Sequence, residues 1–254
     1  RDVFVKRARK EAGIDVEVVS GFEEARLIHL GVLQALPVYD QRIALVDIGG
    51  GSTELLVGEG EHVELARSIG LGAISLTAQF FPEGEWTRQR VDACREFVRD
   101  LLSNAARKIA KLKPSLLIGS SGTVETLVGM SFLRDGGDLP HSMNRAVISA
   151  KAVADAIDQL VEAGSPTAAL ELRGVDAKRC DILLAGAIIL DEVMAAVRLD
   201  ELTFSDGALR EGILFDELSR RTGPLVHPQL SDNRRQGVLH LMEMCEEDPD
   251  HALQ

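Results

Sequence analysis

The stretch that decides the fold is Ile43–Val57, which reads IALVDIGGGSTELLV. An apolar run leads through Asp47 into three consecutive glycines, and a second apolar run follows. Aliphatic runs bounded by glycine and serine predict two strands joined by a loop. Consecutive glycines let the backbone approach a ligand closely and adopt positive φ. A tight hairpin with acidic ends is the alternative, but an ordinary hairpin does not need three glycines in a row.

The residues of this loop suit a phosphate group and a hard cation. Successive backbone N–H groups of a glycine-rich turn converge on phosphate oxygens, and hydroxyl groups add donors. Asp47, at the carboxyl end of the first strand, is a candidate ligand for Mg²⁺. Glu54 begins the returning strand and is expected to face the same loop mouth. The candidate substrate-binding residues of this loop are Gly49, Gly50, Gly51, Ser52 and Thr53.

A second loop of similar composition follows another predicted strand, Ser115–Ile118. A helix is predicted to begin directly after it, so the loop would lie at a helix N-terminus, with its unpaired N–H groups and positive dipole end. Taken alone, the loop is explained equally well as a simple N-cap turn. Its recurrence at the end of a strand in the same sheet indicates two phosphate loops that form a clamp. The candidate substrate-binding residues here are Gly119, Ser120, Ser121, Gly122 and Thr123.

A third feature lies upstream, in Ser20–Arg26, which reads SGFEEAR. Ser20 and Glu23 match a capping box, which predicts a helix that ends near Leu36. Glu23 then has a structural role, whereas Glu24 points elsewhere and is free for chemistry. A carboxylate that faces a phosphate-and-metal site can deprotonate an attacking water. Glu24 is therefore a candidate general base, the alternative being an exposed helix glutamate.

The rest of the pattern predicts a mixed α/β sheet flanked by helices. A hairpin meander comes first, because a glycine-rich turn joins the second strand to a third at Val63–Ser68. Alternating strands and helices follow, which places helices against the sheet. Further strands are predicted at residues 16–19 and 202–205, and helices at residues 91–112, 123 onward, 153–161, 181–197 and 208–220.

The charge balance and cysteine content exclude several classes of function. Lys and Arg total 28 against 40 Asp and Glu, a net charge of −12. Nucleic-acid and anionic-membrane binding need a basic face, so we expect neither; a polyanionic substrate would need backbone N–H groups, metal ions and a few local cations. Three cysteines without metal or disulfide spacing suit a reducing, cytoplasmic setting. The longest apolar run, Ile182–Leu190, is too short to span a bilayer.

Taken together, these segments resemble the Ppx/GppA phosphatase family of the actin-like superfamily. The resemblance extends over nearly the whole chain and rests on five spaced motifs. They are SGFEEARLI at residues 20–28, VDIGGGSTEL at 46–55, IGLG at 69–72, GSSGT at 119–123 and SDGALREG at 205–212. The resemblance implies a ribonuclease-H-like, actin/Hsp70-type fold of two halves, with the active site in the cleft between them.

The resemblance also implies a division of the chain. Residues 1–38 resemble the end of the first half, residues 39–223 the second half with its phosphate loops, and residues 224–254 the start of a helical C-terminal module. In the family the first half opens with its own Asp-x-Gly-x-Asn-Ser loop and carries a later phosphate-binding arginine, and neither occurs here. The sequence also begins without Met and stops abruptly. We therefore expect a fragment that lacks most of the N-terminal half.

The activity implied by the resemblance is removal of terminal phosphate from inorganic polyphosphate or from guanosine pentaphosphate (pppGpp). In the family, the glutamate matching Glu24 is the catalytic base, the glutamate matching Glu54 positions the water, and the aspartate matching Asp47 works with Mg²⁺. The two glycine loops hold substrate phosphates, Arg210 and Glu211 tie the last helix to the sheet, and family members form homodimers. One rival is an ATP-using member of the superfamily, which the Glu24 motif disfavours. Another is a non-catalytic sensor of pppGpp or polyphosphate, which has no need of a base.

Overall fold

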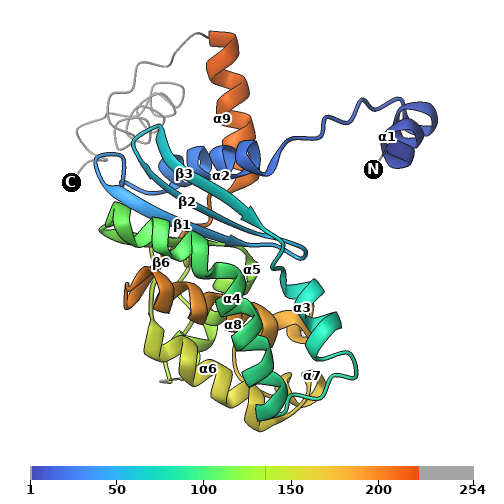
Figure 1. Ribbon diagram of the computed structural model, residues 1–254, viewed down its shortest axis with the longest axis vertical. Helices are drawn as coiled ribbons and strands as arrows, with labels where there is room; N and C mark the ends of the chain where they lie inside the picture. The colour runs from blue at the N-terminus through green and yellow to red at the C-terminus, as the bar shows by residue number, and fades with distance from the viewer. Residues whose placement is uncertain (1, 135, 223–254) are drawn as a thin grey trace, which may run out of the picture.

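The computed structural model describes residues 2–134 and 136–222, and the module predicted at residues 224–254 lies outside them. The described residues form one six-stranded mixed sheet with helices on both faces (Figure 1). The spatial order of the strands is β3-β2-β1-β4-β6-β5. Their bounds are β1 Arg42–Ile48, β2 Thr53–Glu59, β3 His62–Ile69, β4 Leu116–Ser120, β5 Val147–Ser149 and β6 Glu201–Phe204.

The register of the sheet brings the two predicted loops together. β1, β2 and β3 form an antiparallel meander, while β4 lies parallel to β1 and β6 lies parallel to β4. The short β5 pairs antiparallel with β6 at the edge. Asp47 near the end of β1 is in register with Glu54 on β2 and with Ser120 on β4. Because the carboxyl ends of parallel neighbours meet at one edge of a sheet, both loops open at the same place.

Helices cover both faces of this sheet. Their bounds are α1 Asp2–Arg7, the π-helical turn η1 Ala8–Ala12, α2 Gly21–Ala35, α3 Ala73–Phe80, α4 Arg88–Leu112, α5 Gly122–Arg134, α6 Ala150–Ala163, α7 Pro166–Ala169, α8 Cys180–Val197 and α9 Leu209–Thr222. Side chains alternate along β1, so Val46 belongs to the larger core with α4, α6 and α8, whereas Leu45 belongs to a smaller core with α2. Figure 1 shows α2 on one side of the sheet and α4, α6 and α8 on the other. The helix that carries Glu24 is thus packed directly on the strands that carry the other acids.

Most elements predicted from periodicity are confirmed to within three residues at each end. The strand predicted at residues 16–19 is wrong, because this segment belongs to no described sheet, and Val18 and Val19 are 43% and 40% exposed. β-branched residues form a strand only where a neighbouring strand and a covered face support them. The short elements α3, α7 and β5 were not predicted. The boundary proposed at residue 38 stays a prediction, although α2 and the sheet share one core.

Candidate functional site

Three carboxylates from three different elements gather where β1 ends. Asp47 lies on β1, and Glu54 lies opposite it on β2. Glu24 comes from the first turn of α2, and its pKa is raised by burial and then by the negative charges of Glu54 and Asp47. Burial also raises the pKa of Asp47; the hydrogen bond from Ser120 opposes this rise, and the charge of Glu54 adds to it. The fold therefore brings together the three acidic residues that stand out in the sequence.

Hydroxyl groups fix two of these carboxylates. Ser52 Oγ and Ser68 Oγ each donate to Glu54 Oε1 at 2.8 Å, and Glu54 is only 4% exposed. Ser120 Oγ donates to Asp47 Oδ2 at 2.7 Å. Phosphate binding by Ser52 and Ser120 stays a prediction; in this structure their hydroxyl groups donate to the acids.

The first turn of α2 is held beside this acidic cluster. Ser20 Oγ accepts a hydrogen bond from Glu23 N at 3.2 Å, as the predicted N-cap requires. The Glu23 carboxylate bonds Arg26 at 2.7 and 2.9 Å, so its side chain is engaged along the helix rather than back at the cap. Gly21 touches β3, since a Cβ at this position would lie 2.5 Å from Ser68 Cβ. Only a glycine allows the helix to begin this close to the strand.

The first glycine loop rests on the N-terminus of α3. Gly49 O accepts from Ala73 N and Gly50 O accepts from Ile74 N, both at 2.9 Å. The positive-φ glycines of the described chain lie elsewhere, so the expectation of positive φ in this loop is wrong. A Cβ on Gly50 would meet only the flexible end of Ile74, whereas a Cβ on Gly72 would lie 2.2 Å from Gly50 O, so the close packing of this loop requires glycine at position 72. At Gly51, by contrast, no atom lies within 4 Å of such a Cβ, so the outer side of the loop is open to a ligand.

The two threonines among the candidate residues face inward. Thr53 is fully buried and donates through Oγ1 to Leu71 O at 2.6 Å. Thr123 is 3% exposed and packs on α8, where a Cβ on Gly186 would lie 2.6 Å from its Cγ2. These placements do not support either hydroxyl as a phosphate donor.

The second loop offers backbone groups at a helix end. Ser121 has a φ of 105°, a region that residues other than glycine rarely adopt. Helix α5 begins at Gly122, so the N–H groups of its first turn have no partner within the helix. Ser120, immediately before this turn, bonds Asp47. Val124 N, in this first turn, donates to Ser121 Oγ at 3.5 Å, and the helix start lies directly beside the acidic cluster.

One cation at the second loop was missed by the sequence reasoning. Arg179 immediately precedes α8, and its guanidinium lies against Gly122, where a Cβ would be 1.9 Å from Cζ. It also pairs with Asp176, at 3.6 Å between Nε and Oδ2. A cation beside a helix N-terminus opposes the helix dipole, so the two together favour an anion between them. A single arginine in an irregular stretch gave no sequence signal for this contact.

The donor chemistry fits a Mg²⁺ ion. Within residues 2–134 and 136–222, no group of three or more His, Cys, Asp or Glu side chains forms a protein-only metal site. Mg²⁺, however, is usually held by one or two carboxylates together with substrate phosphate oxygens. Asp47 supplies such a carboxylate beside Glu54, and a cation would offset the burial and the like charge that raise the pKa of Asp47.

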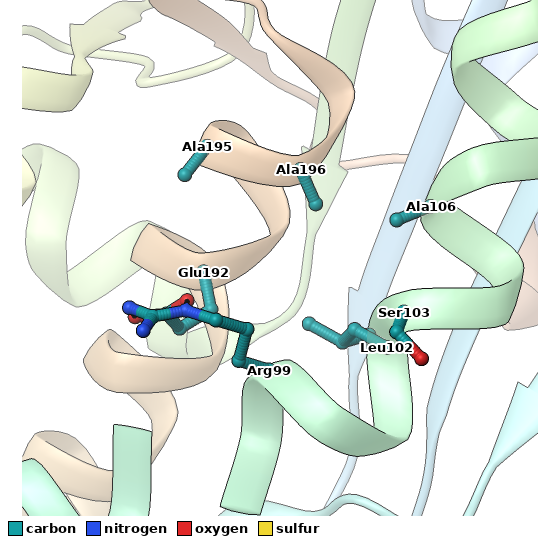
Figure 2. Close-up of a pocket in the computed structure, with 7 residues that line it drawn as sticks. All are labelled: Arg99, Leu102, Ser103, Ala106, Glu192, Ala195 and Ala196. Atoms are coloured by element: carbon teal, nitrogen blue, oxygen red, sulfur yellow. Dashed lines mark hydrogen bonds and ion pairs between the residues drawn. The ribbon is translucent and has the colours of Figure 1, made fainter. Parts of the chain in front are cut away.

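A separate groove of about 240 Å³ lies between α4 and α8 (Figure 2). Arg99 crosses it to the buried Glu192, with 2.9 Å between Nη2 and Oε1. Its lining residues are Arg99, Leu102, Ser103, Ala106, Glu192, Ala195 and Ala196. Because none of these residues belongs to the two loops or to the acidic cluster, the groove is distinct from the candidate site.

The sheet order, the two loops and the acidic cluster define an α/β protein of the actin-like class. The chain belongs to the Ppx/GppA phosphatase family, whose model matches residues 1–221. An exopolyphosphatase from Cytophaga hutchinsonii superposes with a TM-score of 0.76 at 28% identity, covering 86% of this chain and 70% of that one. An Aquifex aeolicus member of the family superposes with a TM-score of 0.72 at 28% identity, covering 87% and 70%. The expected family and fold class are thus confirmed.

Sequence relatives carry two different names. Exopolyphosphatase 1 of Mycobacterium leprae is 31% identical over 243 residues, 93% of this chain and 70% of that protein. A guanosine-5'-triphosphate,3'-diphosphate pyrophosphatase of Vibrio campbellii is 29% identical over 217 residues, 85% of this chain but 41% of that protein. A Haemophilus influenzae relative, 29% identical, is matched over 64% of its length. No helix in the described ranges has the length and apolarity needed to cross a bilayer.

Proposed function

We propose that this protein hydrolyses the terminal phosphoanhydride bond of inorganic polyphosphate or of pppGpp by in-line attack of water. The observation that carries the proposal is the cluster of Glu24, Glu54 and Asp47 at the mouth of two glycine loops. Relatives named as an exopolyphosphatase and as a pppGpp pyrophosphatase support this class of reaction. Both substrates end in the same type of bond, so the proposal covers both.

Each acid has a separate role in this proposal. Glu24 accepts the proton of the attacking water, and its pKa, raised by burial and then by Glu54 and Asp47, makes it a stronger base than an ordinary glutamate. Glu54 orients the same water through Oε2, because the two serine hydroxyls occupy Oε1 and no described residue bonds Oε2. Backbone N–H groups of both loops stabilise the charge that develops on the equatorial phosphate oxygens.

Positive groups at the site offset the negative net charge of the chain, which otherwise opposes binding of a polyanionic substrate. The chain carries a net charge of −12, so a substrate phosphate needs positive groups close at hand. Arg179 supplies one beside Gly122 at the second loop. Asp47 would hold Mg²⁺ together with substrate oxygens, and the bound ion would supply charge neutralisation at the phosphate.

Substitution of the proposed base tests this function. Glu24→Gln keeps the size of the side chain but removes the base, so phosphate release should fall by roughly 10²–10⁴-fold with the fold intact. Glu162→Gln, at an exposed position on α6, serves as the matched control and should release phosphate at the parent rate. Phosphate release by Glu24→Gln at the parent rate would remove Glu24 from the mechanism.

Two further expectations belong to the same proposal. The homodimer implied by the family resemblance is tested by sedimentation analysis, in which a single species at twice the monomer mass is expected. A cytoplasmic location agrees with the absence of paired cysteines among the described residues, where Cys94 and Cys180 are free.

A further inference from the structure

Helix α9 crosses α2 at glycine contacts that leave no room for side chains (Figure 1). A Cβ on Gly31 would lie 2.0 Å from Ala208 O, just before α9 begins. One turn closer to the start of α2, a Cβ on Gly212 would lie 1.8 Å from Leu27 O. Backbone therefore touches backbone at two successive turns, which fixes the distance between the helices at the crossing. Such contacts alone do not fix how the first turn of α2, beyond the crossing, is oriented.

An ion pair extends the contact by one turn along α9, from Gly212 to Asp216, and joins it to Arg26 on α2. Arg26 Nη2 donates to Asp216 Oδ1 on α9 at 2.9 Å and to Glu23 Oε1 at 2.7 Å, while Arg26 Nε donates to Glu23 Oε2 at 2.9 Å. The side chains of Arg26 and Asp216 are 28% and 17% exposed, so the pair is partly shielded from solvent. Arg220 also bonds Asp216, through Oδ2 at 2.8 Å. The guanidinium thus links the first turn of α2 to the neighbouring helix.

The candidate base, Glu24, lies in the same turn as Glu23 and Arg26. Glu24 shares its helical turn with Glu23, whose carboxylate is locked to Arg26 by two hydrogen bonds. On its other side the turn is limited by Gly21, which touches Ser68 on β3. The turn is therefore held between β3 on one side and α9 on the other. A rotation of this turn would move the Glu24 carboxylate relative to Glu54.

We propose that Arg26 and Asp216 act as positioning residues that set the Glu24 carboxylate over the acidic cluster. This inference rests on the proposed function, because it assigns the pair to the alignment of the same general base. The pair touches neither glycine loop, so it acts on the rate of the chemical step rather than on substrate affinity. Misplacement of a reacting group by about 1 Å can cost roughly 10²-fold in rate, which makes such a support measurable.

Four variants of the pair test the proposal in steady-state assays of phosphate release. Arg26→Gln should lower kcat by about 10- to 100-fold with KM within about twofold of the parent, and Asp216→Asn should lower kcat by a smaller factor. The double variant should be no slower than Arg26→Gln, because coupled residues are not additive. Arg26→Lys keeps the positive charge but cannot form the bidentate hydrogen bonds, so its kcat should lie between those of Arg26→Gln and the parent.

A matched ion pair remote from the site provides the control. Arg134 and Asp155 join α5 to α6 at 2.7 Å, with both side chains 32% exposed. Asp155→Asn should leave kcat unchanged while costing similar stability. An unchanged kcat in Arg26→Gln, a rise in KM instead of a fall in kcat, or additive losses in the double variant would each overturn the positioning role. If Arg26→Gln does not fold, Asp216→Asn carries the same comparison.

A spectroscopic readout separates failure of this inference from failure of the proposed function. The carboxyl ¹³C resonance of Glu24, assigned by its loss in Glu24→Gln, should shift or broaden in Arg26→Gln and remain unchanged in Asp155→Asn. A resonance that is identical in the parent and Arg26→Gln overturns the positioning role whether or not the protein releases phosphate. Loss of activity in Glu24→Gln together with normal activity in Arg26→Gln would refute the positioning role alone.

Discussion

Replacement of Gly31 by alanine probes the crossing of α2 and α9 that places the proposed base. The added Cβ would lie 2.0 Å from Ala208 O, whereas real Cβ contacts essentially never fall under 3.0 Å. The helix and the turn before α9 must therefore move apart by about 1 Å, and the obstacle is backbone rather than a flexible side chain. Overpacking of this kind costs about 1–3 kcal/mol. Alanine regains about 1 kcal/mol of helix propensity, so the middle of that range gives an expected net loss of about 1 kcal/mol.

The control is a second glycine in a helix interior that has room. Gly129 lies within α5, and a Cβ there would meet Leu139 Cδ2 at 3.6 Å and Met143 Sδ at 3.9 Å, which are ordinary contacts. Gly129→Ala should therefore stabilise the protein by about 0.4–1 kcal/mol. The two substitutions add the same methyl group to the same type of element but are predicted to act with opposite signs.

Urea unfolding followed by circular dichroism measures both effects. The midpoint should fall for Gly31→Ala and rise for Gly129→Ala, with similar m-values. Phosphate release by folded Gly31→Ala should also fall, by up to roughly 10²-fold, because a displacement of about 1 Å in α2 is passed to Glu24. Equal or higher stability of Gly31→Ala relative to the parent would refute the close crossing of the two helices.

Three other predictions concern the site itself. Burial, and to a smaller extent the charge of Glu54, raise the pKa of Asp47 above its ordinary value of 3.8, so the stability that Asp47 contributes is present below that pH and is lost as the pH rises through the folded-state pKa. Asp47→Asn should therefore be more stable than the parent at pH 7 in urea unfolding, and the difference should close as the pH falls toward 4. This variant should release no phosphate. Mg²⁺ at about 100 times its Kd should stabilise the parent by about 2.7 kcal/mol and leave Asp47→Asn unchanged; an equal gain in both would place the ion elsewhere. Gly122→Ala should cost little stability, since the flexible end of Arg179 can move away from the new Cβ. The displaced guanidinium should raise KM for polyphosphate by about tenfold. An unchanged KM would remove Arg179 from substrate binding.

Local signals in the sequence were enough to predict the centre of the fold. Aliphatic runs on either side of a glycine-rich loop predicted β1 and β2, and the capping signal at Ser20 predicted the start of α2. The second loop was predicted because its glycines and serines also follow a strand. Each of these features depends on residues that are close together in the chain.

Features that depend on residues far apart in the chain could not be predicted. Ser68 donates to Glu54 only because β3 lies beside β2, and Arg179 reaches Gly122 only because the start of α8 lies against the start of α5. Phosphate binding by Ser52 stays a prediction, and only the fold shows that its hydroxyl donates to Glu54. The segment at residues 16–19 has the composition of a strand but no place in the described sheet.

The most direct test is to measure phosphate release from long-chain polyphosphate and from pppGpp with Mg²⁺. The account predicts that the protein releases orthophosphate from the terminus of at least one substrate, and the ratio between the two substrates identifies the preferred one. Tight binding of both anions without phosphate release from either would contradict a hydrolase and support a non-catalytic sensor.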